Sequence, residues 1–497
     1  MSVHAEIPRH RGIITACAMI ATLMQALDGT IANVALPYMQ GSLAATADQI
    51  TWVLTSYVIA AAILTAPVGW LARRFGRRRV FLASVGGFTL ASVLCGAAQS
   101  LEQMVVFRLL QGMFGAALVP LSQATMLDIY TPAERGRAMA IWGVGVMVGP
   151  IMGPTLGGLL TDAYSWRWVF YVNLPFGALA CLGLALFMAP DRDTEAVRFD
   201  WVGFASLGIG IGALQFLLDR GELKDWFGSR EIWAEAVLGG LGLWIFLVHM
   251  LTAERPFLPR ALFADRNFLA GIGVMLFVGA ILLASAALLA PYMQVLGGYP
   301  VLTAGLLLAP RGIGTIAAMM LGGRLANRID PRRLMLAGVL LLAWTLHEMA
   351  RWTPDVDAWT LGVMTTFQGF ALGLVFLPLQ LVAFATLPAW LRTDATAVFS
   401  LLRNLGGAVG IAVCAALLAR GTQGLHAEIA AGVTPLNRML ALPGSAAWDI
   451  GTARGLALLD REVTRQAQII AYGNDYLLLM GCALLAAALV LAMRRPA

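Results

Sequence analysis

The sequence contains very little charge and almost no lysine. Only 12% of its 497 residues are charged, while 59% are hydrophobic and the mean hydropathy is +0.77. A soluble chain of this length needs far more charge to cover its surface, so this composition excludes a soluble globular protein. Lys224 is the only lysine, so no lysine follows a glycine-rich phosphate loop and an ATP-driven pump is disfavoured.

Residues for metal, redox or covalent chemistry are also scarce. The five cysteines all fall inside apolar runs, which favours small buried hydrophobic side chains over disulfides. No group of histidine, cysteine and acidic residues has metal-ligand spacing, and no nucleophile and base form a credible pair. We therefore predict no metal site, no catalytic residues, no cofactor and no enzymatic activity. The net charge of +6 resides in short loops, which indicates membrane topology and not a nucleic-acid partner.

Apolar stretches recur along the whole chain. Each has about 18 or more residues, the length that crosses a hydrocarbon core of about 30 Å. We therefore predict an all-α integral membrane protein in contact with lipid. The stretches 200–218 and 232–252 are the weakest, with surface helices as the alternative. The fourteen predicted spans are 12–36, 51–72, 80–98, 104–127, 138–160, 168–189, 200–218, 232–252, 268–293, 302–322, 332–350, 357–385, 398–419 and 476–493.

Basic residues are concentrated in alternate loops. The loops on one side hold 21 arginines, whereas the short loops on the other side hold five basic residues, Arg167, Arg220, Lys224, Arg230 and Arg351. Because cytoplasmic loops are enriched in arginine and lysine, this asymmetry predicts that both termini are cytoplasmic. It also requires an even number of spans, since a shift by one helix would abolish it.

An internal repeat relates the two halves of the chain. Residues 37–40 (Pro-Tyr-Met-Gln) recur as residues 291–294, at an offset of 254. Six residues of 69–79, namely Gly69, Leu71, Ala72, Arg74, Arg78 and Arg79, meet the same residue types at that offset, and two further blocks recur at offsets of 257 and 258. The repeat predicts a six-helix bundle in 1–190, an inserted helix pair with its linker in 191–267, and a second six-helix bundle in 268–497 with an outside loop at 420–475. A substrate site is then expected near the midplane between the bundles.

Asp28 is an acid deep inside the first span. Its insertion costs on the order of 2.5–3.5 kcal/mol, so it needs a partner or a function. One interpretation is a carboxylate that pairs with a neighbouring helix. The other is a protonatable site, since burial favours the neutral acid and a cationic substrate or an arginine favours the anion.

Arg108 and the fifth span contain the other candidate functional residues. Arg108 is either a fixed positive charge that acts on a nearby acid or anion, or a snorkelling residue near the outer interface. Gly145, Gly149, Gly153 and Gly157 are spaced by four, so they form one ridge for close helix packing, and Pro150 and Pro154 favour bending. Arg403 falls near the corresponding place in the second half, where it would pair with an acid or line a cavity.

Several motifs resemble the major facilitator superfamily, specifically its fourteen-span drug:proton antiporters of the EmrB/QacA type. Residues 27–37 resemble that group's first-helix motif, and 69–79 resemble the superfamily's cytoplasmic loop signature. The blocks around Arg108 and over 149–158, together with 166–175 and 401–407, are also similar to family motifs. The candidate residues of the loop are Gly69, Arg73, Arg74, Gly76, Arg77 and Arg78.

The resemblance implies roles for these residues. Asp28 would be the acid that responds to protons and substrate, and Arg108 would take part in proton coupling. The glycines and prolines of 145–158, Gly158 included, would form the antiporter hinge, and Asn33, Gln111 and Arg403 are candidates for the cavity. Arg73 stands where the superfamily has an aspartate that latches the cytoplasmic side. Asp128, at the end of the fourth span, is an acid that could pair with Arg77.

The outside segment 420–475 is the least apolar part of the chain. Leu456, Leu459, Val463 and Ile470 recur at helical spacing, which predicts an amphipathic helix, with a packed loop as the alternative. In Gram-negative relatives of the EmrB type, a periplasmic adaptor connects the exporter to an outer-membrane channel. This segment, and 425–450 in particular, is where such an adaptor would bind.

Together these observations predict a proton-coupled secondary-active exporter of lipophilic small molecules, a multidrug efflux protein of the bacterial inner membrane. A transporter dedicated to a metabolite, siderophore or fatty acid is the alternative. A receptor or scaffold without transport is disfavoured, because it has no use for an acid inside the membrane.

Overall fold

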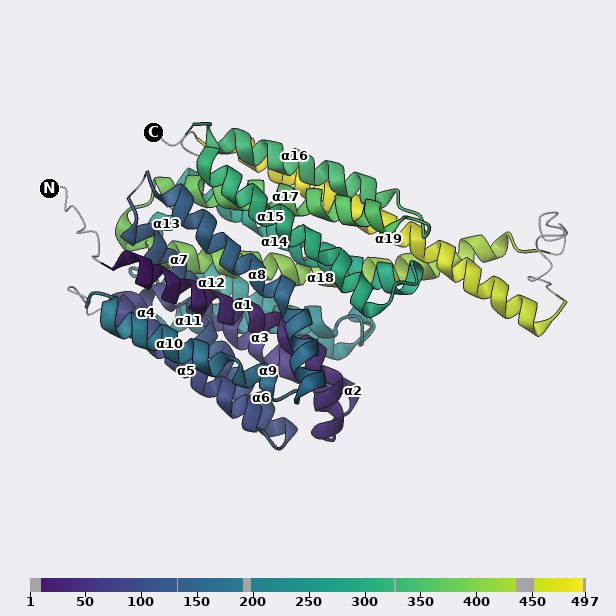
Figure 1. Ribbon diagram of the computed structural model, residues 1–497, viewed down its shortest axis with the longest axis horizontal. Helices are drawn as coiled ribbons and strands as arrows, with labels where there is room; N and C mark the ends of the chain where they lie inside the picture. Colours follow the sequence, from purple (N-terminus) through teal and green to yellow (C-terminus); the bar gives the residue numbers. More distant parts are fainter. Residues whose placement is uncertain (1–9, 132, 191–197, 326–327, 435–450, 495–497) are drawn as a thin grey trace.

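The computed structural model describes residues 10–131, 133–190, 198–325, 328–434 and 451–494, apart from the side chains of 47, 48, 150, 151, 154, 301 and 302. Over these residues, twelve helices are long and apolar enough to cross a membrane, or thirteen if a bent helix pair counts as one span. The predicted span 138–160 corresponds to α8 (Arg135–Ala163), which is 29 residues long but is not among the twelve. Figure 1 shows the long helices running side by side along the molecule.

The helices of the first half pack mainly with one another. In this first bundle, α1 lies between α8 and α10, while α6 packs against α3 and α5. Three predicted spans contain a break, and the sharpest is the 57° bend between α3 and α4, where Pro67 interrupts the backbone hydrogen bonds. The helices are α1 (Arg11–Ser42), α2 (Ala47–Ile50), α3 (Trp52–Thr65), α4 (Val68–Phe75), α5 (Arg77–Ala97), α6 (Leu101–Gly115), α7 (Leu118–Ile129), α8, α9 (Trp168–Tyr171) and α10 (Asn173–Phe187).

The second bundle repeats this arrangement with longer, mostly unbroken helices. In it, α14 packs against α18, and α17 packs against α15 and α16. Its helices are α14 (Arg266–Pro291), η2 (Tyr292–Leu296), α15 (Val301–Leu325), α16 (Pro331–Ala350), α17 (Ala358–Ala385), α18 (Arg392–Ala431) and α19 (Ala453–Ala492). The short elements η1 (Trp226–Gly228), α13 (Ala261–Ala264) and η3 (Ala389–Leu391) lie in connections.

A helix pair separates the two bundles in the chain. The pair consists of α11 (Trp201–Arg220) and α12 (Arg230–Thr252), and both helices are long and apolar enough to cross a membrane. They approach closely where Gly210 meets Gly242, because a methyl group on Gly242 would lie 2.6 Å from the Gly210 nitrogen. The pair contacts α3 of the first bundle and α18 of the second.

Two glutamines at corresponding places in the two halves of the chain form a hydrogen bond where the bundles meet. Gln123 of α7 donates a hydrogen bond of 2.9 Å to Gln380 of α17, and these two residues are 257 positions apart. This separation is one of the three offsets of the repeat, so the two glutamines occupy closely corresponding places in the two halves. Contact between corresponding positions agrees with the parallel duplication that the sequence predicts.

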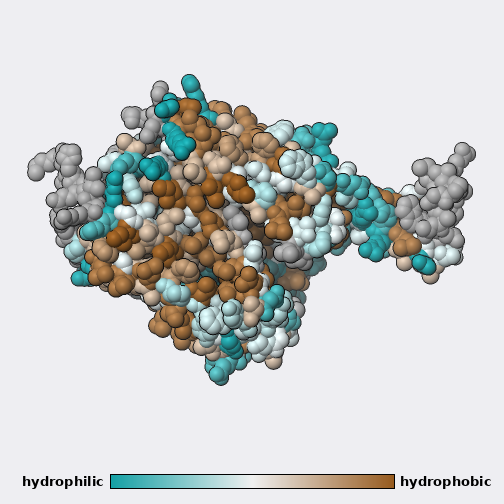
Figure 2. All heavy atoms as spheres, viewed as in Figure 1, coloured by the Kyte–Doolittle hydropathy of each residue, from teal (hydrophilic) through white to brown (hydrophobic). Residues whose placement is uncertain are grey.

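The contacts that join the bundles gather toward one end of the molecule. We call it the Arg11 end, because α1 begins there and α19 ends there. Trp142 of α8 stacks on Phe376 of α17 at 6.4 Å, and Gly143 and Gly323 admit close contacts between α8 and α15. Figure 2 shows apolar side chains over much of the flank of the bundles, as expected of a surface that faces lipid.

The opposite end carries an arm, which we define as residues 422–434, including the end of α18, and residues 451–470, including the beginning of α19. Figure 1 shows both helices continuing well beyond the bundles. Each is 40 residues long and extends beyond its predicted span, 398–419 or 476–493, because the apolar runs end before the helices do. The predicted amphipathic helix is confirmed. However, Leu459 and Val463 are buried, whereas Leu456 and Ile470 are exposed, since the buried line follows a spacing of four.

Candidate functional site

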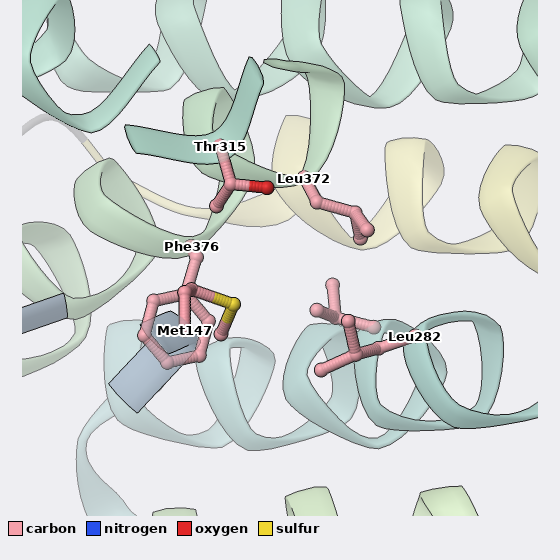
Figure 3. Close-up of a pocket in the computed structure, with 6 residues that line it drawn as sticks. Met147, Leu282, Thr315, Leu372 and Phe376 are labelled. Atoms are coloured by element: carbon pink, nitrogen blue, oxygen red, sulfur yellow. The ribbon is translucent and has the colours of Figure 1, made fainter. Parts of the chain in front are cut away.

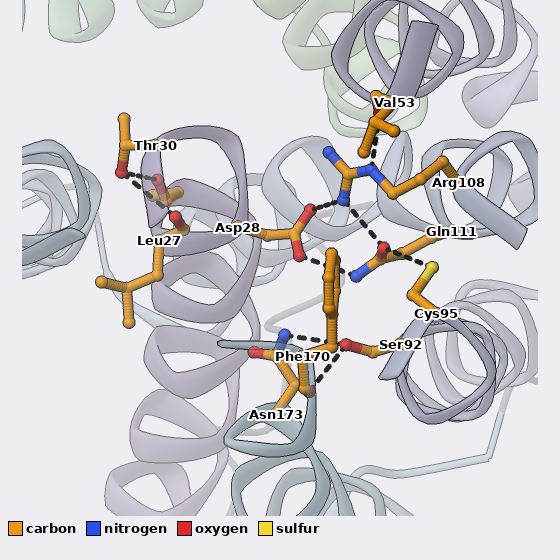
Figure 4. Close-up of polar contacts among 11 residues, drawn as sticks. Leu27, Asp28, Thr30, Val53, Ser92, Cys95, Arg108, Gln111, Phe170 and Asn173 are labelled. Carbon is orange, nitrogen blue, oxygen red and sulfur yellow. Dashed lines mark hydrogen bonds and ion pairs between the residues drawn. The ribbon is translucent and has the colours of Figure 1, made fainter. Parts of the chain in front are cut away.

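Asp28 and Arg108 form an ion pair in the middle of the first bundle. Arg108 on α6 donates a hydrogen bond of 2.7 Å from Nη1 to Oδ2 of Asp28 on α1. Both side chains are fully buried, and Figure 4 shows them pointing toward each other from the two helices. Two opposite charges removed from water stabilise each other only when the geometry is good and the remaining polar atoms are bonded.

Gln111 completes this polar cluster. Its Nε2 donates to Oδ1 of Asp28 at 2.7 Å, and its Oε1 accepts from Arg108 Nη1 at 2.9 Å. Arg108 Nε donates to the backbone carbonyl of Val53 at 2.9 Å, and the guanidinium lies 4.2 Å from the centre of the Tyr57 ring. Both oxygens of Asp28 therefore have donors, and Arg108 is held on several sides (Figure 4). The snorkelling interpretation of Arg108 is thereby excluded.

The second bundle has no such ion pair at the equivalent positions. At the repeat offsets, Leu282 stands in place of Asp28, and Thr365 in place of Arg108. Thr365 still donates to the carbonyl of Leu307, just as Arg108 donates to the carbonyl of Val53. The hydrogen bond to the backbone is thus common to both halves, whereas the acid and its arginine occur in one half only.

The predicted glycine ridge of α8 packs against α1 on either side of Asp28. A methyl group on Gly149 would lie 2.5–2.8 Å from Ala26 and Leu27, and one on Gly153 would lie 2.1 Å from Thr30 Oγ1. Gly145 faces Met19 and Gly157 faces Ile31 in the same way, so all four predicted glycines lie on this ridge. Gly158 does not, because its nearest neighbour would be Val34 at 3.9 Å. The side chains of Pro150 and Pro154 lie outside the described residues.

The loop between α4 and α5 contributes charges to the boundary between the bundles. Gly76 has φ +89°, a conformation that favours glycine, and it connects the two helices. A methyl group on Gly69 would lie 2.0 Å from Oδ1 of Asp394, so this glycine admits the carboxyl group at the start of α18. Arg73 forms an ion pair with Asp394, whose side chain is only 1% exposed. Sequence reasoning did not identify Asp394, which has no motif of its own.

A second charged group lies at the same end. Asp128 of α7 pairs with Arg77, which confirms that prediction, and it also pairs with Arg392 of α18. The acid therefore joins the first bundle to the second. Of the remaining loop arginines, Arg78 donates to the carbonyl of Ala185, and Arg74 is exposed.

Glu134, just before α8, adds a further ion pair at the Arg11 end. It accepts a hydrogen bond of 3.0 Å from the Thr131 hydroxyl and pairs with Arg11 at 3.0 Å. The bond from Thr131, followed by the Arg11 interaction, lowers the pKa of the Glu134 carboxyl below its ordinary value. The connection between α7 and α8 is thereby attached to the beginning of α1.

A small cavity lies between α8 of the first bundle and α14, α15 and α17 of the second (Figure 3). Met147 of α8 is its lining residue from the first bundle, and the others come from α14, α15 and α17. The lining is apolar apart from the Thr315 hydroxyl, which donates to the Arg311 and Gly369 carbonyls. The lining residues are Met147, Val278, Leu282, Thr315, Leu372 and Phe376.

Asn33, Gln111 and Arg403, the residues predicted to line the cavity, are not among its lining residues. Gln111 belongs to the Asp28 cluster, whereas Asn33 is exposed on α1 and lies apart from it. Arg403 is half-buried on α18, where its backbone packs against Gly279 of α14. Arg311 of α15 was not identified from the sequence, although a charge inside an apolar run of the second half could have indicated it.

Comparison with known proteins gives consistent matches over nearly the whole chain. Residues 18–411 match the profile of the Major Facilitator Superfamily. The chain is 35% identical to the multidrug export protein EmrB of Escherichia coli K12, over 97% of this chain and 95% of that protein. It is also 35% identical to the fatty acid resistance protein FarB of Neisseria gonorrhoeae, over 93% and 92%. A crystal structure of the human organic anion transporter MFSD10 (TETRAN) has a TM-score of 0.61 at 15% identity, covering 97% of this chain and 100% of that chain, which shows likeness of fold.

Proposed function

This chain belongs to the Major Facilitator Superfamily, and on that premise we propose that it is a multidrug efflux transporter that exports lipophilic small molecules in exchange for protons. The names of its relatives support export, since EmrB is a multidrug export protein. The observation that supports proton exchange is the buried ion pair of Asp28 and Arg108. Hydrogen bonds surround this pair, and the equivalent positions of the second bundle have no such pair.

Protonation of Asp28 would change the packing of the first bundle. The neutral acid no longer attracts Arg108, and the hydrogen bonds around it must rearrange in a dry environment. Gly149 and Gly153 of α8 lie directly against α1 beside Asp28. A movement of the helical turn that carries Asp28 would therefore also move α8. Since α8 contacts α15 of the second bundle, the proton then acts on the relative position of the bundles.

The arrangement across the membrane follows from the arginine distribution. In this proposal the chain has fourteen spans, with α8 and the pair α3–α4 each counted as one. Both termini are in the cytoplasm of a bacterial cell, so the Arg11 end faces the cytoplasm and the arm faces outward from the inner membrane. The division into 1–190, 191–267 and 268–497 describes the two bundles and the inserted pair. The ion pairs of Arg73 and Asp128 then close the cytoplasmic side in this conformation.

The arm gives this proposal a partner. Its outer surface is mainly hydrophilic (Figure 2), and it extends beyond the level at which lipid would cover the bundles. We place the contact with a periplasmic adaptor, and through it with an outer-membrane channel, on this arm. Part of the predicted contact region 425–450 lies outside the described residues, namely 435–450.

A transporter dedicated to one class of metabolite is the second candidate. The similarity to FarB, a fatty acid resistance protein, favours fatty acids as that class. The two candidates share the proton site and differ in the range of compounds that the cavity accepts.

The test uses purified protein in proteoliposomes with an imposed pH gradient. Substrate-dependent proton release is expected from the wild type and is expected to vanish in Asp28→Asn, which cannot exchange a proton. Asp162→Asn is the matched control, because Asp162 is an exposed acid of the same bundle. Flux that does not depend on the gradient, or equal loss in both variants, would reject proton exchange at Asp28.

A further inference from the structure

The segment 166–175, which resembles a family motif, is attached to the end of α5. Arg167 donates from Nη1 to the carbonyl of Gly96 at 2.8 Å and to that of Ala98 at 2.6 Å. Both carbonyls lie where the helix ends and its last backbone acceptors lack partners within the helix. The Tyr171 ring packs against Gly96, where a methyl group would lie 2.5 Å from the ring. Because α5 begins in the loop at the Arg11 end, this attachment lies at the other end of the first bundle.

A buried hydrogen-bond chain attaches the same segment to α5 one turn earlier. Asn173, the first residue of α10, donates from Nδ2 to the Ser92 hydroxyl at 3.0 Å, and this hydroxyl donates to the carbonyl of Phe170 at 2.9 Å (Figure 4). The three side chains are almost completely buried. Buried polar groups that satisfy one another favour a single geometry, so this chain fixes Phe170 relative to α5.

The ring of Phe170 lies beside the Asp28 cluster. Its centre is 5.7 Å from the guanidinium of Arg108, and the ring is fully buried. Trp166 meets Phe170 edge to face, with the ring centres 6.3 Å apart, and it is buried as well. An aromatic ring attracts a guanidinium through its π electrons and at the same time keeps water away from it. Phe170 and Trp166 therefore cover the cluster on the side of the segment 166–175.

The turn of α5 that these contacts hold also takes part in the cluster. Cys95 follows Ser92 by about one turn and donates from its thiol to Oε1 of Gln111 at 3.4 Å. Gln111 in turn donates to Asp28. The Cys95 thiol is fully buried, so it is a reactive group inside the region that Phe170 covers.

All of these residues belong to the first bundle. When the bundles move against each other as rigid bodies, the ring of Phe170 stays beside Arg108, because the two residues move together. The ion pairs of Arg73 and Asp128 are different, since each joins the two bundles and must break when the bundles separate at that end.

We propose that Phe170 closes the Asp28 cluster toward the end opposite the Arg11 end in every position of the bundles, and that Arg167 and Asn173 are the positioning residues that hold it there. Protons then reach the Asp28 carboxylate only from the space between the bundles, and they leave into the same space after the bundles have moved. The exported compound uses this space too.

This inference rests on the proposed export function, because it says how exchange at Asp28 is enforced. A proton and a substrate that share one route must take turns. A second route that stayed open would let protons pass without substrate. The segment 166–175 closes such a route.

The test uses Cys95 as a reporter in the full-length protein in lipid nanodiscs. The probe is 2-sulfonatoethyl methanethiosulfonate, a charged thiol reagent, and mass spectrometry measures its addition to Cys95. In Phe170→Ser, water can enter the space left beside Arg108 and Gln111, because its lining is polar. We expect at least about tenfold faster labelling of Cys95 than in the wild type.

Three further variants show whether the ring itself is responsible. Phe170→Leu fills the space with apolar atoms and should be labelled as slowly as the wild type. Asn173→Ala removes the donor to Ser92 and should accelerate labelling about threefold. Phe176→Ser is the matched control, because Phe176 of α10 is 44% exposed and should leave the rate unchanged.

Cys414 serves as the internal reference for folding. It is buried in the second bundle, so unfolded protein is labelled at both cysteines, and the ratio of Cys95 to Cys414 labelling reports the opening of the first bundle alone. A wild type in which Cys95 is labelled as fast as in Phe170→Ser overturns the proposal.

Proton leakage gives a second measurement. In proteoliposomes without substrate, Phe170→Ser should dissipate an imposed pH gradient at least about threefold faster than the wild type. The double variant Phe170→Ser/Asp28→Asn should return to the wild-type rate, because the leak passes through Asp28. A leak that persists in the double variant contradicts the proposal. Failure of the export function gives a different result: Cys95 labelling follows the expected pattern, but the wild type shows no substrate-dependent proton release.

Discussion

Arg73 of the first bundle forms an ion pair with Asp394 of the second bundle, and the Asp394 carboxyl group packs directly against Gly69. The cytoplasmic loop signature of the superfamily has an acid at the position of Arg73, and here the charge is reversed. The acid is supplied by the opposite bundle instead, so the ionic contact between the bundles is retained. Gly69 has the same physical role in either case, because only a residue without a side chain lets α18 approach so closely.

The first prediction concerns this reversed ion pair. Arg73→Gln leaves the Asp394 carboxylate buried without a counter-ion, which disfavours the closed Arg11 end of the transporter by about 3–5 kcal/mol. We expect at least tenfold slower transport in Arg73→Gln, and a smaller loss in the double variant Arg73→Gln/Asp394→Asn, which buries no unpaired charge. Transport rates in proteoliposomes for the two single variants and the double variant measure this coupling.

Arg74→Gln is the control for this double-mutant comparison, because Arg74 is an exposed arginine close to Arg73 in the chain. If the losses of the two single variants simply add in the double variant, Arg73 and Asp394 do not act as a pair.

The glycine ridge of α8 gives a prediction about packing. In Gly149→Ala the new methyl group would lie 2.5–2.8 Å from Ala26 and Leu27, two of these contacts being with backbone atoms, and this overpacking costs about 1–3 kcal/mol. We expect a lower unfolding temperature and reduced transport. Gly158→Ala is the matched control, because its methyl group would meet only Val34 at 3.9 Å. Equal behaviour of the two variants would show that α8 does not rest on α1 through this ridge.

Gln111 allows a test of the proton site without removing Asp28. In Gln111→Glu, the donor to Asp28 Oδ1 is replaced by an acid of nearly the same shape. Two neighbouring carboxyl groups hold a shared proton more tightly than one acid paired with an arginine does. We therefore expect substrate-driven proton release to move to higher pH, as a pH series in proteoliposomes would show. A profile like that of the wild type would place proton release elsewhere in the protein.

The arm can be deleted by cutting α18 and α19 at positions that lie side by side in the structure. A methyl group on Gly421 would lie 3.5 Å from Ala471, so these residues define one level, and His426 contacts Asp460 at 3.1 Å farther out. We expect replacement of 424–468 by a short glycine-serine turn to leave proton-driven transport within about twofold of the wild type, since the Asp28 cluster and the cavity lie elsewhere in the fold. Cross-linking to a periplasmic adaptor should be lost. Retained cross-linking would place the adaptor contact elsewhere on the transporter.

The sequence by itself determined the class of protein, the positions of most helices and the internal repeat. These features depend on local properties, namely the length of apolar runs, the glycine spacing and the distribution of arginine between loops. It also identified Asp28 and Arg108, because a charge in an apolar run is recognisable without knowledge of its neighbours. The outer parts of α18 and α19 lie beyond the predicted spans because they carry no apolar run, and only that of α19 was predicted, from its helical spacing.

Only the tertiary structure decided which of these residues meet. Asp28 and Arg108 are 80 residues apart, and Arg73 and Asp394 are 321 residues apart, so no local pattern connects them. The same holds for Arg311 and Leu282, whose contact depends on how α15 packs against α14. Pairing between helices is set by their distance and rotation, which follow from side-chain packing along their whole length and not from the spacing of residues in one segment.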